Sequence, residues 1–420
     1  MKNKTFSKSL LCILMLMISA LSIHAASHGG GIEPFDDFNN DNAFNYGMQN
    51  AQTFFINIGA DALSYQNMLP IADFLEVMKS DTIDLAKYSD SVMENIGEGD
   101  AKFNIFGRGL ASFGLNITPI YTIGGYVDLK ADSGFTIPNW IMEIVFKGNQ
   151  LTQYPTYEEK GPVLDAMISA GGVLGMKTDW GMVSVGVGAY GPAMYATLDR
   201  YADVQATPTA VGTVSLDAKV YSAVDLDFAN FNLQELDYGG LLKGIKTDIG
   251  VVIGRYNPVC GIAVKDIPIT SAQLNYEANL LDIEASFTSD PINFSTNTNI
   301  PDKIIFEKMT EPIEYRAKPT ISGFFNLPFT ETLSMVLHAN TSGLSGTYIG
   351  ATLSDKLGMN FLVSADITGS LNGAMMYSAG LGFHSGFYKL KINAGIGTIK
   401  PFDFKTIGSP RLSVSTSLYF

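Results

Sequence analysis

The chain has 420 residues, of which 46% are hydrophobic and 16% charged, and its formal net charge is −14. The charged fraction lies below the roughly 25% of an ordinary soluble domain, and this much apolar and aromatic material excludes a disordered chain. Two cysteines exclude a disulfide scaffold. After residue 25, no apolar run is long enough for a transmembrane helix, which needs about 20 residues.

Residues 1–25 have the pattern of a secretory signal peptide. Lys2, Lys4 and Lys8 precede an unbroken apolar stretch, and small residues follow as far as Ala25, where we expect cleavage. Cleavage removes these lysines and no acidic residue, so the exported chain is more acidic still. Because phosphate binding needs a basic surface, we expect no nucleic-acid partner. Few histidines and one cysteine remain, so we expect no metal site and no cofactor.

Residues 26–104 lack a regular hydrophobic period. Pro70–Met78 predicts a short helix with proline in its first turn. Asp81 is a suitable N-cap for a second helix, which runs to Ile96 and ends at Gly97. We therefore expect an N-terminal segment that contains short helices, which could be a plug in the lumen of the domain that follows, a periplasmic extension or an extracellular cap.

Residues 105–420 are dominated by apolar residues at every second position. One segment has Val214, Leu216, Ala218 and Val220 in one phase and Ser215, Asp217 and Lys219 in the other. A helix would distribute these residues around its circumference, whereas a strand places the charges on one face. Many such segments are about 9 to 12 residues long, which is the length of a tilted strand that crosses a bilayer.

Three features favour a membrane barrel over a soluble β protein. Strands of soluble sandwiches are shorter, about 5 to 6 residues. The polar phase is rich in glycine, as a crowded lumen requires, and aromatic residues gather near segment ends, as in interfacial girdles. We predict an all-β fold, a transmembrane antiparallel β-barrel of about 14 strands. Within it, Val163–Lys177 and Gly181–Tyr190 should form a hairpin, and residues 290–314 a long extracellular loop.

The polar phase of the predicted strands supplies candidates for side chains that face the lumen. These are Asp217, Lys219, Asp225, Asp227, Lys265, Asp282, Glu284, His338, Asp366, His384, Lys389 and Lys391. Such charges would favour cations in an open lumen, or they pair across neighbouring strands and fill a closed interior. Neither His338 nor His384 has a nucleophile in its sequence context, so we expect that the chain is not an enzyme and has no catalytic residues.

The last ten residues of the chain form the most specific motif. Leu412, Val414, Leu418 and Phe420 share one phase, and serines occupy the other. The segment resembles the closing strand of bacterial outer-membrane β-barrels, in which the alternation ends in a C-terminal aromatic residue. The resemblance implies that the barrel-assembly machinery reads this segment. An exported barrel has an unpaired edge until closure removes it, so such a signal has a physical purpose.

The organisation of the whole chain resembles the FadL-like and TraF-like group of outer-membrane β-barrels, which includes long-chain fatty-acid transporters. Signal peptide, N-terminal segment, alternating strands and aromatic end occur in the same order. Residues 261–266 (GIAVKD) and 318–324 (KPTISGF) are similar to recurring strand openings of the group, whereas a clear Asn-Pro-Ala near the N-terminus is missing. The resemblance implies a 14-stranded barrel with an N-terminal plug, and no binding residue is carried over.

Three functions fit these observations. The first is passive uptake of small, hydrophobic molecules, such as long-chain fatty acids, across the outer membrane of a bacterium with two membranes. Its partners would be outer-membrane lipid, the assembly machinery and the cargo. The second is a general diffusion pore, a porin. The third is a structural or adhesive surface protein that acts through its loops.

Overall fold

The computed structural model describes residues 54–419 with interruptions. The interruptions are residues 71, 74–75, 77–84, 148–153, 206–210, 227–236, 255–258, 290–291, 300, 302–303, 331, 343–345, 358–360, 371–374, 386–387 and 400–406. The predicted signal peptide, Phe420 and most of the helix predicted at 70–78 therefore lie outside the described residues.

The described chain forms long strands and three helices. The strands of the first half are β1 (Phe54–Gln66), β2 (Ala101–Asn116), β3 (Tyr121–Ile137), β4 (Tyr157–Lys177), β5 (Gly181–Gln205), β6 (Val211–Ser222), β7 (Gly244–Ile253), β8 (Cys260–Thr270) and β9 (Ala272–Ser289). Those of the second half are β10 (Ile292–Asn299), β11 (Glu307–Tyr315), β12 (Thr320–Pro328), β13 (Leu333–Ser342), β14 (Gly346–Leu357), β15 (Phe361–Ser370), β16 (Met375–Ser385), β17 (Tyr388–Thr398) and β18 (Ile407–Tyr419). The helices are α4 (Leu85–Ile96), α5 (Asn139–Lys147) and α6 (Tyr238–Leu241).

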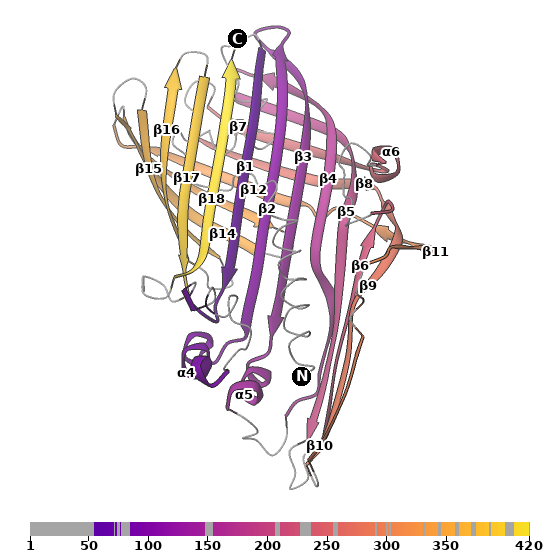
Figure 1. Cartoon of the computed structure of the whole chain (residues 1–420). Coiled ribbons are helices and arrows are strands. Elements are labelled where there is room, and N and C mark those ends of the chain that lie inside the picture. Colours follow the sequence, from indigo (N-terminus) through magenta and orange to yellow (C-terminus); the bar gives the residue numbers. More distant parts are fainter. Residues whose placement is uncertain are drawn as a thin grey trace.

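Fourteen strands close into an antiparallel ring (Figure 1). The order around the ring is β1, β2, β3, β4, β5, β7, β8, β12 and then β13 to β18. The last strand returns to the first, with Phe55 opposite Tyr419 and Leu63 opposite Arg411. This ring confirms the predicted barrel and its strand number.

The ring begins earlier than the predicted boundary at residue 105. β1 and the first residues of β2 come from the segment 26–104, and β1 closes the ring between β18 and β2. Its side chains are small around Gly59, Ala60 and Ala62, so its alternation is weak in sequence. The second predicted helix is present as α4, which lies in the connection between β1 and β2 and packs on α5 through Val92 and Met142.

Four further strands form a side sheet beyond the ring: β6, β9, β10 and β11. The sheet starts where β5 forks, because Gly181–Tyr190 pair with β7 and Tyr195–Gln205 pair with β6. β9 then pairs with β6 on one edge and with β10 and β11 on the other. The predicted loop at 290–314 is therefore wrong, since β10 and most of β11 fall within it. The polar residues and Pro312 of these segments interrupt the apolar alternation by which the other strands were predicted. Both features are common at sheet edges.

The outer surface of the ring is apolar at every strand. Each strand exposes a large hydrophobic side chain, in ring order Ile58, Phe113, Val127, Leu174, Val187, Ile249, Ile262, Phe325, Leu337, Ile349, Ile367, Leu381, Ile392 and Leu412. A continuous apolar band is what a bilayer requires of a barrel. No helix within the described ranges is long and apolar enough to cross a membrane.

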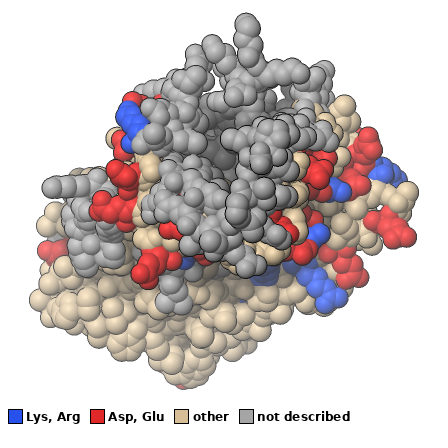
Figure 2. Space-filling view, turned by 90° about the horizontal axis from the view of Figure 1, so that it is seen from below, with Lys and Arg blue, Asp and Glu red and all other residues tan. Residues whose placement is uncertain are grey.

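The two ends of the barrel differ in their connections. Short turns, such as those of β2 to β3 and β4 to β5, lie at the end where β18 finishes, whereas α4, α5 and the side sheet belong to the opposite end (Figure 1). Around that opposite end, Asp and Glu outnumber Lys and Arg in the face that Figure 2 shows. Outer-membrane barrels have short turns on the periplasmic side and long loops outside. The side sheet is therefore on the side expected to face the exterior.

Candidate functional site

Many of the buried charges inside the ring belong to two groups. We name the first the Asp266 cluster, which comprises Arg108, Tyr126, Asp128, Lys130, Lys246, Asp248 and Asp266. We name the second the Asp366 cluster, which comprises Asp61, His338, Thr352, Asp366, Thr368 and Arg411. The alternation of the strands explains their position, because the apolar phase faces outward and leaves the polar phase inside.

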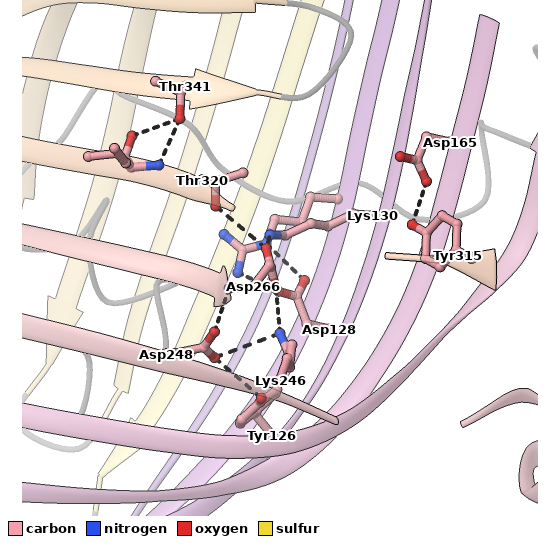
Figure 3. Close-up of polar contacts among 12 residues, drawn as sticks. Tyr126, Asp128, Lys130, Asp165, Lys246, Asp248, Asp266, Tyr315, Thr320 and Thr341 are labelled. Atoms are coloured by element: carbon pink, nitrogen blue, oxygen red, sulfur yellow. Dashed lines mark hydrogen bonds and ion pairs between the residues drawn. The ribbon is translucent and has the colours of Figure 1, made fainter. Parts of the chain in front are cut away.

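The Asp266 cluster connects strands that are not neighbours in the ring (Figure 3). Lys246 Nζ of β7 lies 2.5 Å from Asp266 Oδ1 of β8 and 3.7 Å from Asp248 Oδ2. Lys130 of β3 forms an ion pair with the other carboxylate oxygen of Asp266. Tyr126 of β3 donates from its hydroxyl to Asp248 Oδ2 at 3.3 Å. Side chains of β3 therefore reach β7 and β8 across the inner faces of β4 and β5.

Arg108 and Asp128 complete this cluster on the side of β2 and β3. The guanidinium donates from Nε and Nη2 to the two carboxylate oxygens, at 2.8 and 2.7 Å. Both side chains are 1% exposed. A two-point contact of this kind holds both side chains in one geometry, and in a buried site neither charge can be removed cheaply.

Asp266 enters the interior because the pairing of β7 and β8 is irregular. The register shifts between Thr247 and Ile249, so that Lys265 and Asp266 both lie opposite Asp248. Both are buried, and Asp266 has a φ of 57°, a left-handed conformation that few residues other than glycine adopt. A bulge of this kind turns an additional side chain to one face of a sheet. Its backbone N–H donates to Asp248 Oδ1 at 2.7 Å.

Glycines of β4 and β5 make room for the side chains that cross them. A Cβ at Gly188 would lie 2.5 Å from Tyr126 Oη, and one at Gly171 would lie 2.9 Å from the same oxygen. Neither position accepts a larger residue while Tyr126 reaches β7. These glycines therefore leave space on the inner faces of β4 and β5 for the longer side chains that cross them.

The Asp366 cluster repeats this arrangement on another part of the ring. Asp366 of β15 accepts hydrogen bonds from Thr352 and Thr368 at 2.9 and 2.8 Å, and its Oδ1 lies 3.0 Å from His338 Nε2. Arg411 of β18 lies 3.5 Å from Asp366 and 3.4 Å from Asp61. It reaches β15 across β16 and β17, whose glycines also lie against polar side chains of the interior.

Apolar side chains line the interior toward the end with short turns. One group, with side chains from β1, β2, β3 and β4, consists of Phe55, Leu110, Tyr126 and Val173. The other, from β5, β7, β8, β12 and β13, consists of Met182, Val252, Ala263, Phe324 and Val336. On this side the clustered charges are therefore followed by two apolar groups, with buried polar residues such as Ser112 and Thr122 among them.

Four tyrosines gather near the fork of β5, beyond the apolar band. Tyr315 lies with its ring centroid 6.1 Å from that of Tyr190 and 5.9 Å from that of Tyr195, and Tyr195 also contacts Tyr221. The Tyr315 hydroxyl donates to Asp165 Oδ1 at 2.6 Å. Burial raises the pKa of Asp165, and the hydrogen bond from Tyr315 opposes this shift only in part. We name these four tyrosines with Asp165 the tyrosine cluster.

The predicted lumen residues fall into three sets. Lys265, His338, Asp366 and Lys391 are buried inside the ring. Asp217, Lys219, Asp282 and Glu284 lie instead on the side sheet, and Asp225 is exposed after β6. Asp227 and the side chains of His384 and Lys389 are outside the described residues. The strands of the side sheet have the same alternation of apolar and polar residues as the ring strands. The sequence period therefore did not distinguish side-sheet strands from ring strands.

Several interior residues were not predicted, among them Arg108, Asp128, Lys130, Lys246 and Asp266. Arg108 had a detectable signal, since it stands between two glycines in an alternating segment. Asp266 had none, because the bulge moves it out of the phase that its sequence position implies.

The C-terminal motif forms β18, the strand that closes the ring. Leu412 and Val414 face outward and are exposed, and Leu418 is half-buried opposite Ile56. Arg411 and Ser413 point inward and are buried. The apolar phase of the motif therefore belongs to the outer surface.

Comparisons with known proteins give neighbours of similar architecture. No protein-family model and no curated protein sequence matches the chain. A FadL homologue from Pseudomonas aeruginosa is 9% identical with a TM-score of 0.43, over 94% of this chain and 100% of the homologue. A deltaS2 mutant of the monoaromatic hydrocarbon channel TodX is 7% identical with a TM-score of 0.42, over 88% and 91%. The P. putida toluene transporter TodX is 7% identical with a TM-score of 0.39, over 88% and 91%.

These neighbours are described as a channel, a transporter and a FadL homologue. At such low identity and scores, the architecture of this chain rests on its own strand pairing. The structures that the chain resembles thus include a FadL homologue, the family named from the sequence.

Proposed function

We propose that the chain is a passive channel for small hydrophobic molecules in the outer membrane of a bacterium with two membranes. The apolar band on all fourteen ring strands supports a membrane location. The observation that carries the choice of cargo is inside the ring. Within each of the two clusters the charges form ion pairs, whereas apolar groups lie on one side of the Asp266 cluster and tyrosines on the other.

The cargo would enter at the tyrosine cluster and leave past the two apolar groups toward the end with short turns. Tyrosine offers a large apolar face together with a hydroxyl, so a cluster of tyrosines suits a molecule that is mostly hydrocarbon with one polar end. Long-chain fatty acids are one such class and monoaromatic compounds are another. The acidic rim in Figure 2 does not favour highly charged anions.

Binding at the tyrosine cluster tests this proposal. The purified chain in lipid vesicles is titrated with a fluorescent long-chain fatty acid, and Tyr195→Ala is compared with Tyr201→Ala. Both residues are half-buried on β5, but only Tyr195 contacts the other tyrosines. The expected result is saturable binding that Tyr195→Ala weakens and Tyr201→Ala does not. Absence of saturable binding to fatty acids and to toluene would refute the proposal.

A general diffusion pore is the second candidate. The observation in its favour is the wall from β14 to β18, whose buried inward residues include Thr352, Ser354, Ser378, Asn393 and Ser413. A hydroxyl- and amide-lined wall suits water and small polar solutes. Conductance of the wild-type chain in a planar bilayer separates the two candidates, because a general pore conducts ions without any change to its sequence.

We also propose that the barrel-assembly machinery captures the C-terminal strand before closure. The structural support is that β18 has β17 on one edge and β1 on the other, so this strand closes the ring. A chain that lacks the last ten residues should be exported but should fail to give a folded barrel. Normal assembly of that chain would contradict this proposal.

A further inference from the structure

Asp266 is the point at which side chains of β3, β7 and β12 meet inside the ring. Its carboxylate receives Lys130 from β3, Lys246 from β7 and, at 3.5 Å, the hydroxyl of Thr320 from β12. In the ring, β3 and β8 are separated by β4, β5 and β7, so no backbone pairing joins them. The contact between these two sides is made by side chains (Figure 3).

The cluster lies at the level of the apolar band. Ile245 and Ile249 are exposed on the outer face of β7, and Lys246 and Asp248 between them are almost fully buried inside. The contacts of Asp266 therefore bridge β3 and β8 over the inner faces of β4, β5 and β7, within the membrane rather than at its surface.

Asp266 occupies this position at a conformational cost. A residue other than glycine in the left-handed region is strained and persists only where its surroundings hold it. The surroundings here are two lysines, the backbone contact with Asp248 and the bulge between β7 and β8. Release of the Asp266 side chain would leave the backbone pairing of the ring intact, so the contact between β3 and β8 can break without unfolding of the barrel.

We propose that the Asp266 cluster is a gate, closed in this structure, and that the passage opens when Lys130 separates from Asp266. With this ion pair broken, Lys130 and the Asp266 carboxylate oxygen that it contacts would each take up water. Lys130 would then return to its own wall, β3, and the bridge between β3 and β8 through Asp266 would be lost. The gate is a property of the lumen and does not depend on which cargo the channel carries.

Charge removal from either wall tests the gate. Asp266→Asn keeps a residue that tolerates the left-handed conformation and removes the charge. Lys130→Gln removes the partner on β3, where the backbone is an ordinary strand. Asp282→Asn is the matched control, because Asp282 is exposed on the side sheet and outside the ring.

Each chain is reconstituted in a planar lipid bilayer, and ion conductance is measured at equal amounts of folded protein. Folded protein is quantified by the shift in gel mobility that heating produces in barrels. The expected result is at least about tenfold higher conductance for Asp266→Asn and for Lys130→Gln than for the wild type. Asp282→Asn should match the wild type, and the double variant should conduct no more than the stronger single one.

Two results would overturn the gate. One is a folded Lys130→Gln chain as silent as the wild type, which decides the matter even if Asp266→Asn fails to fold. The other is a wild-type chain that conducts as well as the variants, which would also support the general pore. Failure of fatty-acid binding would leave the conductance comparison unaffected, so the gate and the proposed cargo are tested separately.

Discussion

Substitution of a single glycine in the β4–β5 hairpin should destabilise the whole barrel. A Cβ at Gly171 would lie 2.4 Å from the carbonyl oxygen of Val187 and 2.6 Å from the Cα of Gly188, both in the backbone of β5. Because these atoms belong to a paired strand, they cannot rotate away, and β4 must move from β5. Overpacking of this kind costs about 1–3 kcal/mol. Gly171→Ala should therefore lower the free energy of unfolding by that amount.

The neighbouring glycine supplies the control. Gly172 faces outward, and a Cβ there would lie 3.6 Å from the nearest heavy atom, the carbonyl oxygen of Gly124, which is ordinary contact. Gly172→Ala should change the free energy of unfolding by less than about 0.5 kcal/mol. Both variants are unfolded with urea in lipid vesicles, and fluorescence of Trp180 in the adjoining turn is recorded. Equal stabilities of the two variants would refute the assignment of β4's lumen face.

Three further substitutions test other parts of the structure. Asp128→Asn leaves the Arg108 guanidinium buried without its carboxylate and should cost about 3–5 kcal/mol in urea unfolding, and a loss below 1 kcal/mol would contradict the two-point contact. Leu412→Arg places a charge on the outer face of β18 and should cost about 2–4 kcal/mol in a bilayer, whereas the same stability as wild type would mean that this face is not in lipid. For Asp165, the raised pKa means that protonation stabilises the native state fully below the ordinary pKa of about 3.9, and this stabilisation is lost as pH rises through the raised value. Asp165→Asn should therefore gain stability over the wild type at neutral pH and not below pH ~3.9, and a pH-independent difference would argue against a buried carboxylate.

The barrel could be predicted because each ring strand has one face toward lipid and the other toward the interior. Apolar residues in one phase meet lipid, and small or polar residues in the other meet the interior, so a period of two appears in the sequence wherever both faces are selected. β1 shows the limit of this signal. With Gly59, Ala60 and Ala62 in its centre, neither phase is distinct, and its place in the ring depends on pairing with β18 and β2.

The interior charges were harder to predict because their position depends on contacts between distant strands. Asp282 and Asp366 both lie in alternating segments, yet the first is on the side sheet and the second inside the ring. The difference arises at the fork of β5, where Gly191 and Gly244 fit closely against Leu241 and Tyr190. A local pattern cannot encode which of two partners a strand edge will take. Asp266 is harder still, since a bulge changes its face.

Uptake of a matched pair of solutes tests the central claim most directly. Vesicles with an outer leaflet of lipopolysaccharide, which slows apolar solutes, are prepared with and without the purified chain. A long-chain fatty acid and a hydrophilic sugar are then supplied outside, and their appearance inside is followed over time. A hydrophobic channel predicts that the chain accelerates entry of the fatty acid and leaves entry of the sugar unchanged. Equal acceleration of both solutes, or no acceleration of the fatty acid, would contradict it.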